Sequence, residues 1–212
     1  MAAAFNEMNW LAHLYLSEPT PQFRVGNLLP DLASGSKLVS LPEPYQQGIR
    51  RHRQIDAFTD GHPRVKSCVS RFSKPYRRYG GILTDVYFDH FLARDWAKYS
   101  KISLAEFISG VYGDIEVCLP DVPAEVAHVL RRMRSENWLA SYDHIAGITE
   151  TLRRISFRFR RPFDLSRSLP VFEEHEADFA DDFHAFFLEL TMHVQRTSPD
   201  QSSPVATAES TT

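Results

Sequence analysis

The stretch RRHRQIDAFTDGH, residues 50–62, predicts a helix that turns two polar side chains toward the protein interior. With the residues just before it, the stretch places Tyr45, Ile49, His52 and Asp56 at positions i, i+4, i+7 and i+11 of one helix face. Because the first two residues are apolar, this face is expected to pack against the core. The imidazole and the carboxylate that share the face are therefore expected to be buried as well.

The remaining polar residues of this stretch have other expected roles. Arg50, Arg51 and Arg53 fall off the apolar face and are expected to point toward solvent. Asp60 and His62 flank a glycine and precede a proline, so we interpret them as the end of the helix and its turn. Of the polar residues in this stretch, only His52 and Asp56 are thus expected to face the interior.

Helical periodicity continues along nearly the whole chain, and no stretch alternates convincingly at period two. The sequence predicts an all-α protein with one domain at residues 8–196. Residues 197–212 are rich in Ser, Thr, Pro and Ala and are predicted to be a disordered tail. Residues 18–42, with several prolines and glycines, are predicted to form a loop with perhaps one short helix. The expected helices cover residues 5–17, 44–60, 65–72, 82–100, 103–119, 123–133, 144–159 and 171–194.

Composition indicates a folded protein of the cytoplasm. Hydrophobic residues make up 43% of the 212 residues and aromatic residues 12%, which is enough for a sizeable core. The two cysteines, Cys68 and Cys118, lie far apart without metal-binding spacing and suit a reducing compartment. No basic, apolar leader opens the chain, and its longest apolar run is too short to cross a bilayer. We therefore expect no membrane association.

Charge is segregated along the chain although the net charge is only −3. Residues 50–78 hold nine Lys and Arg against two Asp, and residues 131–161 hold eight Arg against three acids. Residues 173–189 hold seven acids and no Lys or Arg. This pattern favours an acidic partner, a phosphate-bearing substrate, or pairing between two ends of the fold. The arginines are not interleaved with stacking aromatics, so nucleic-acid binding is not expected.

Several ionisable side chains occupy positions that are expected to be buried. They are His13 in WLAHLYL, Asp31 at the end of VGNLLPD, His52, Asp56, Asp85, Asp89 and His90. The burial of each of these residues also has an ordinary structural explanation that needs no site. His13 is compatible with a core histidine bonded to a carbonyl, Asp31 with a helix cap, and Asp85 and Asp89 with arginine partners.

The combination is harder to explain by such separate roles. Burying several carboxylates and histidines costs several kcal/mol per ion unless something compensates them. A divalent cation is the simplest shared compensator, since mixed imidazole and carboxylate shells suit manganese, iron, zinc and magnesium. Neither a nucleophile elbow nor a glycine-rich phosphate loop is present in the sequence. A helical metal site of this kind favours hydrolysis of a phosphoester.

Six segments together carry a resemblance to a known family. They are MNWLAHLYLS, GNLLPDLASG, GIRRHRQIDAFTDGHP, GILTDVYFDHFLARDW, ENWLASY and LRRISFRFRRP. In order and spacing they resemble the acyl carrier protein phosphodiesterases, also called acyl carrier protein hydrolases, an atypical branch of the HD superfamily. The resemblance extends over nearly the whole chain except the tail, and it implies an HD-like helical bundle.

The resemblance also implies an activity. Members of this family hydrolyse the phosphodiester that joins 4′-phosphopantetheine to a serine of holo acyl carrier protein, which leaves the apo carrier. They need a divalent metal, typically manganese, with magnesium or iron as alternatives. Asp31 matches the family aspartate thought essential for activity and metal use. The order Asp89-His90, and His52 followed by Arg53, depart from the His-Asp dyad of ordinary HD enzymes, so ligands cannot be copied from those enzymes.

These considerations give one set of predicted site residues. Asp31, His52, Asp56 and Asp85 are expected to surround the metal and to be catalytic. His13, Asp89 and His90 are expected to be further ligands or to support them. Arg50, Arg51 and Arg53 are expected to dock the acidic carrier protein.

Two rival functions remain open on the sequence alone. One is an HD-like phosphohydrolase of a nucleotide or another small phosphodiester. The other is a non-catalytic helical protein that binds acyl carrier proteins.

Overall fold

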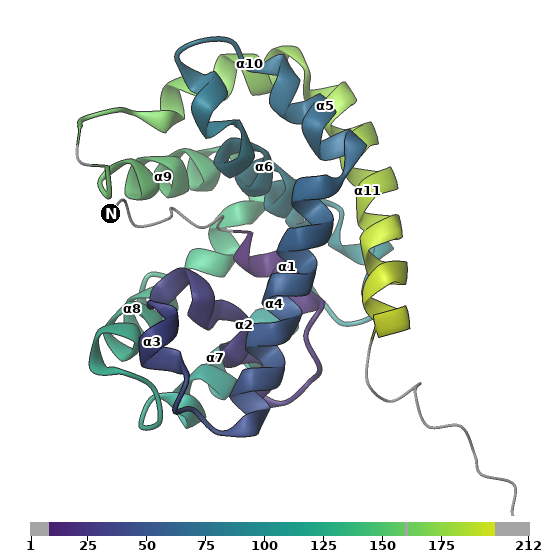
Figure 1. Cartoon of the computed structure of the whole chain (residues 1–212). Helices are drawn as coiled ribbons and strands as arrows, with labels where there is room; N and C mark the ends of the chain where they lie inside the picture. Colours follow the sequence, from purple (N-terminus) through teal and green to yellow (C-terminus); the bar gives the residue numbers. More distant parts are fainter. Residues whose placement is uncertain (1–8, 160, 198–212) are drawn as a thin grey trace, which may run out of the picture.

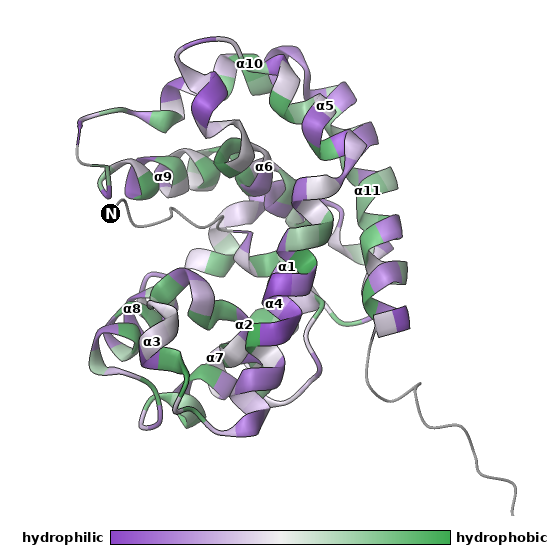
Figure 2. Cartoon of the chain, viewed as in Figure 1, coloured by the Kyte–Doolittle hydropathy of each residue, from purple (hydrophilic) through white to green (hydrophobic). Residues whose placement is uncertain are grey.

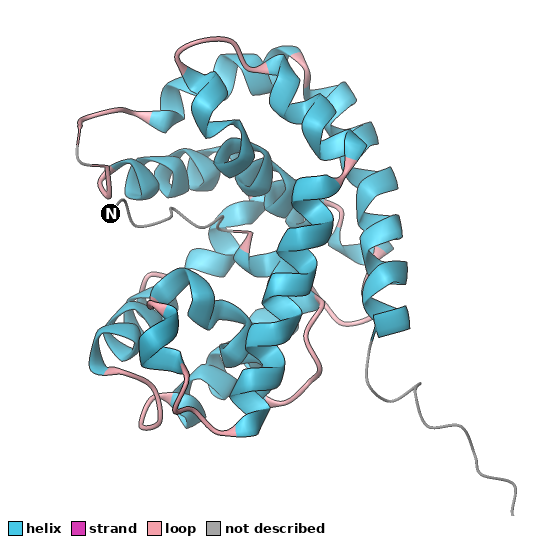
Figure 3. Cartoon of the chain, viewed as in Figure 1, coloured by secondary structure: helices cyan, strands magenta, loops and turns pink. Residues whose placement is uncertain are grey.

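The computed structural model describes residues 9–159 and 161–197 as a set of helices (Figure 1). The described residues contain no strand, and short loops join the helices (Figure 3). The predicted all-α class is therefore confirmed. The α-helices are α1 (Trp10–Tyr15), α2 (Pro21–Leu32), α3 (Gly35–Leu38), α4 (Glu43–Gly61), α5 (Pro63–Arg71), α6 (Gly80–Arg94), α7 (Leu104–Cys118), α8 (Ala124–Ser135), α9 (Ile145–Ser156), α10 (Leu169–Glu174) and α11 (Glu176–Thr197). The 3-10 helices are η1 (Tyr76–Tyr79), η2 (Trp96–Lys98), η3 (Trp138–Asp143) and η4 (Leu165–Ser168).

Helix α6 forms the centre of the core. Every residue from Leu83 to Ala93 is buried, as expected for a helix that other elements surround. It packs against α1, α5, α9, α11 and η3. Hydrophilic residues are instead prominent on outer helices such as α4, α5 and α11 (Figure 2). Asp85, Asp89 and His90 lie on α6 and are buried, as the sequence predicted.

Helix α2 is the main departure from the predicted secondary structure. Residues 18–42 were expected to be a loop with perhaps one short helix, but α2 alone has 12 residues. Pro21 lies in its first turn, where an N–H has no helical partner in any case. Pro30 lies in the last turn of α2 and does not end the helix before Leu32. Packing against α4 stabilises α2 despite its prolines. Local sequence signals do not reveal this packing.

Two glycines let α2 and α4 approach closely. A Cβ atom on Gly26 would lie 2.4 Å from the Tyr45 carbonyl oxygen, and one on Gly48 would lie 2.2 Å from the Phe23 carbonyl oxygen. Real Cβ atoms do not come that close to backbone oxygen atoms. The contact between the two helices therefore requires glycine at both positions, and it positions the polar residues that α2 and α4 carry.

The C-terminal helix and the tail differ from their predictions or lie outside the described residues. One helix was expected over residues 171–194, but the backbone turns at His175 and separates α10 from α11. Thr197, predicted to begin the tail, is the last residue of α11. The rest of the predicted tail, residues 198–212, lies outside the described residues. Among the helices that the structure describes, none has the length and apolarity needed to cross a membrane.

The close contact between α2 and α4 predicts opposite effects for two alanine substitutions. Gly48→Ala should lower the free energy of unfolding by about 1–3 kcal/mol, because the new methyl group collides with the α2 backbone. Gly110→Ala in α7, where a Cβ would meet nothing within 4 Å, should raise it by about 0.5–1 kcal/mol. Urea unfolding of both variants measures the effects. Equal changes in the two variants would contradict the proposed role of Gly48.

Candidate metal centre

Four of the predicted site residues meet between α1, α2 and α4. His13 Nε2 lies 3.3 Å from Asp56 Oδ1, and His52 Nε2 lies 3.0 Å from Asp56 Oδ2. Asp31 Oδ1 lies 3.5 Å from His52 Nε2. The ligand atoms of His13, His52 and Asp56 all fall within 4.8 Å of one another. We call these four side chains the His–Asp cluster.

Asn27 determines which ring nitrogen of each histidine carries its proton. The Asn27 amide nitrogen donates to the His13 carbonyl oxygen and to Ser17 Oγ, both at 2.8 Å, so its Oδ1 faces His13 Nδ1 at 2.9 Å. Since this oxygen only accepts, His13 Nδ1 must donate. His52 Nδ1 likewise donates to the Asn27 backbone carbonyl at 2.7 Å. Both neutral rings therefore direct an Nε2 lone pair into the cluster.

The interior of the cluster brings electron-rich atoms together. Nε2 of His13 and of His52, and Oδ1 of Asp31 and of Asp56, are buried and make no hydrogen bond of acceptable geometry. Two lone pairs and two carboxylates repel one another unless positive charge lies among them. A shared proton can bridge two of these atoms at a time, whereas a divalent cation can be bound by all four. The donor set fits such a cation.

Burial and mutual contact shift the protonation equilibria of the cluster. Burial raises the pKa of Asp31 to about 7, although the nearby His52 opposes this shift. Burial also raises the pKa of Asp56, but its contacts with His13 and His52 outweigh burial and hold that pKa below its usual value. Burial lowers the pKa of His13. For His52, burial acts in the same direction, but Asp56 and Asp31 outweigh it and raise the pKa.

Two residues that the sequence analysis did not single out complete the surroundings of Asp31. The Trp10 indole N–H donates to Asp31 Oδ2 at 2.9 Å, which leaves Oδ1 turned toward His52. Arg158, just beyond the end of α9, lies close enough for its charge to lower the pKa of Asp31. Asn27 was missed too, although it stands in the quoted segment GNLLPD, because no sequence pattern shows that its side chain bonds one histidine and its backbone carbonyl another.

The three predicted site residues on α6 are not among the three side chains whose ligand atoms converge within 4.8 Å. Asp89 accepts the backbone N–H groups of Leu11 and Ala12, both at 2.9 Å, and so holds the start of α1. His90 Nδ1 donates to the Tyr142 carbonyl at 2.7 Å. Asp85 is buried one turn before Asp89, and its predicted place at the metal stays a prediction. Asp89 therefore acts on the cluster indirectly, because α1 carries His13.

Two of the three predicted docking arginines are exposed. Arg50 and Arg53 are exposed, and Arg50 is paired with Glu43. The expectation that Arg51 faces solvent is wrong, because only 3% of its side chain is exposed and it donates to the Leu16 carbonyl at 3.1 Å. Its guanidinium lies over the Phe23 ring of α2, a helix that the sequence analysis did not anticipate at this length.

Comparison with known proteins identifies the family of the chain. The sequence model of a family described as acyl carrier protein phosphodiesterase matches residues 8–190, which include the whole His–Asp cluster. The chain belongs to this family. The family predicted from the six sequence segments is therefore confirmed.

Relatives named acyl carrier protein phosphodiesterase are similar over most of their length. The protein of Pectobacterium atrosepticum is 34% identical over 85% of this chain and 94% of its own. The protein of Yersinia pestis is 33% identical over 89% of this chain and 98% of its own. The protein of Photorhabdus laumondii is 35% identical over 85% of this chain and 91% of its own. No solved structure matches the chain significantly, so the HD-like label of the bundle stays a prediction.

The raised pKa of Asp31 predicts a pH-dependent cost in metal-free protein. Between the usual value of 3.8 and about 7, the folded chain keeps a proton that the unfolded chain releases, so stability falls as the pH rises through this window. Asp31→Asn removes the cost. In EDTA the variant should therefore be more stable than wild type by several kcal/mol at pH 8, and the difference should shrink toward pH 4. Urea unfolding across this range measures it, and a difference that does not change with pH would contradict the assignment.

Proposed function

We propose that this chain is a metal-dependent phosphodiesterase that removes 4′-phosphopantetheine from holo acyl carrier protein. The products are apo carrier protein and free 4′-phosphopantetheine. The observation that carries the proposal is the His–Asp cluster, in which Asn27 turns two imidazole lone pairs toward the carboxylates of Asp31 and Asp56. Membership of the acyl carrier protein phosphodiesterase family supports the choice of substrate.

The cluster supplies ligands for a divalent cation. His13, His52, Asp31 and Asp56 would hold it, and manganese suits this mixed imidazole and carboxylate set, with iron and magnesium as alternatives. When bound, such a cation neutralises charge on the phosphodiester and makes water more acidic. Trp10 and Asn27 would keep Asp31 and the two histidines oriented, as supporting residues do in metal sites.

The chain's own residues suggest how the substrate is oriented. Asp56 reaches solvent, with 22% of its side chain exposed, whereas the side chains of His13, His52 and Asp31 are at most 2% exposed. The phosphodiester would therefore approach from the Asp56 side, and Arg158 beside Asp31 would attract its phosphoryl oxygens. Water attacks phosphorus, the bond to the carrier serine breaks, and the serine oxygen takes a proton. The water loses one proton in this step and the serine oxygen gains one, so the protons balance.

A mass measurement tests the proposed reaction. Incubated with holo acyl carrier protein and Mn²⁺, the chain should convert the carrier to a species lighter by the 4′-phosphopantetheine group. Asp31→Ala should lose at least roughly 100-fold in rate, since even residues that only support ligands account for 10–100-fold. His90→Asn, which keeps a donor for the Tyr142 carbonyl outside the cluster, should retain activity.

Two outcomes would contradict the proposal in different ways. If wild type with Mn²⁺ binds the carrier but leaves the prosthetic group in place, the chain is a non-catalytic carrier-binding protein. If wild type cleaves a small phosphodiester but not holo carrier, it is a phosphohydrolase of another substrate.

The role of Asn27 predicts an effect on metal affinity. Asn27→Leu removes the acceptor for His13 Nδ1, so the ring proton is free to move to Nε2, where it would repel a cation. Affinity for Mn²⁺ should fall by about 10–100-fold. Asn27→Asp retains an acceptor oxygen and should lose less. Calorimetric titration with Mn²⁺, on variants shown to be folded by circular dichroism, measures both, and equal affinities of Asn27→Leu and wild type would rule out this role.

A further inference from the structure

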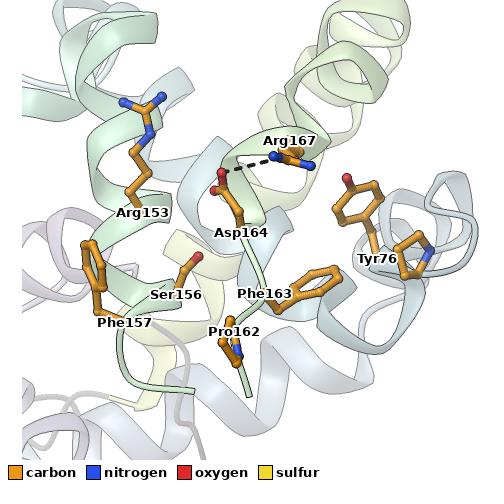
Figure 4. Close-up of a pocket in the computed structure, with 9 residues that line it drawn as sticks. Tyr76, Arg153, Ser156, Phe157, Pro162, Phe163, Asp164 and Arg167 are labelled. Carbon is orange, nitrogen blue, oxygen red and sulfur yellow. Dashed lines mark ion pairs between the residues drawn. The ribbon is translucent and has the colours of Figure 1, made fainter. Parts of the chain in front are cut away.

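A groove of about 630 Å³ opens between the C-terminal half of α9, η1 and the segment that leads into η4 (Figure 4). Aromatic rings form its apolar lining. Tyr76 and Phe163 pack with ring centres 5.6 Å apart, and Phe163 also packs against Tyr79 at 4.8 Å. Phe157 lines the opposite side, and 87% of it is exposed. The exposed ring of Phe157 and the aromatic lining of the groove together form one apolar surface, and an exposed apolar surface with polar residues around it is typical of a contact with another protein.

Arginines surround this apolar lining. Arg153 and Arg167 line the groove, and the Arg78 guanidinium lies over the rings of Tyr79 and Phe163 at 4.5 and 5.4 Å. Arg77 and Arg161 are exposed nearby in the sequence.

Few acids offset these charges. The ion pair of Arg153 with Glu150 spans 4.0 Å, and that of Arg167 with Asp164 spans 3.7 Å (Figure 4). Exposed pairs at such distances contribute little, so the cations stay available to a partner.

Consecutive residues of one segment link the groove to the His–Asp cluster. Phe157 lines the groove, and the next residue, Arg158, carries the charge that lowers the pKa of Asp31. A partner that covers Phe157 therefore contacts the segment that also brings a positive charge to act on Asp31. A protein substrate needs such a link, because its reactive group has to reach the cluster while its surface contacts the enzyme.

We propose that this groove docks the carrier protein, through an acidic surface that places one apolar side chain against Phe157 and Phe163. The inference rests on the proposed function, since it assigns a binding surface to that substrate. Its basis is complementarity, because an apolar pocket rimmed by arginines matches an apolar residue surrounded by carboxylates. By contrast, Arg50 is paired with Glu43, and none of the large exposed apolar side chains in the described part of the chain lies on α4.

The test uses the full chain, with apo carrier for binding and holo carrier with Mn²⁺ for turnover. Arg153→Glu/Arg167→Glu removes the cationic rim, and Phe157→Ser removes the apolar anchor. Each should weaken binding of apo carrier about tenfold or more, and should raise KM for holo carrier by a similar factor with kcat little changed. Affinity for Mn²⁺ should stay as in wild type, which shows that the His–Asp cluster is intact.

Matched variants elsewhere on the surface control for charge and hydrophobicity. Lys101→Glu/Arg131→Glu makes the same change in net charge at exposed positions away from the groove, and Val117→Ser removes an exposed apolar side chain of α7. Both should bind and turn over the carrier like wild type.

The possible failures are distinguishable. Groove variants that behave like their matched controls overturn the docking surface. So does loss of binding in Arg50→Glu/Arg53→Glu while the groove variants bind normally. If wild type binds apo carrier through the groove but does not cleave holo carrier, the proposed activity fails and the docking surface stands.

Discussion

The site depends on one buried residue, Asn27, which bonds both histidines of the His–Asp cluster at once. Its side-chain oxygen accepts from His13 and its backbone oxygen accepts from His52. The bond from His52 requires α2 to lie against α4 at a distance that only glycine at positions 26 and 48 permits, whereas the bond from His13 joins α2 to α1. The packing of α2 against its two neighbouring helices is thereby coupled to the protonation of two imidazole rings. A small shift of α2 would alter the orientation of both rings without touching either directly.

The same arrangement makes the site costly in the absence of a cation. Asp31 is buried so deeply that its pKa rises to about 7, and several ring and carboxylate atoms have no hydrogen bond. Active sites are often the places where a chain keeps such unfavourable contacts, because the function requires them. Here the unfavourable contacts gather two imidazoles and two carboxylates at one point, which is the preorganisation that the proposed divalent-metal site would require.

Sequence reasoning succeeded where a local pattern carries the information. The spacing of Tyr45, Ile49, His52 and Asp56 predicted an inward face, and both polar residues are in the cluster. It failed where a distant segment decides the environment. Arg51 is off that face, yet the chain after α1 and helix α2 cover it. Asp89 was expected to be a ligand or to support one, but the sequence did not show that it accepts backbone N–H groups at the start of α1, 77 and 78 residues away. Neither partner could be deduced from spacing along one helix.

The sequence by itself determined the helical class and the family, because periodicity and motif order are properties of the chain read in one dimension. It also determined that several carboxylates and histidines would be buried. Only the tertiary structure decided which of them meet: His13, His52, Asp56 and Asp31 converge, whereas Asp89 and His90 are used elsewhere. The physical reason is that hydrogen bonding and ion pairing act over a few ångströms in space, and the residues concerned come from helices whose separation along the chain says nothing about that distance.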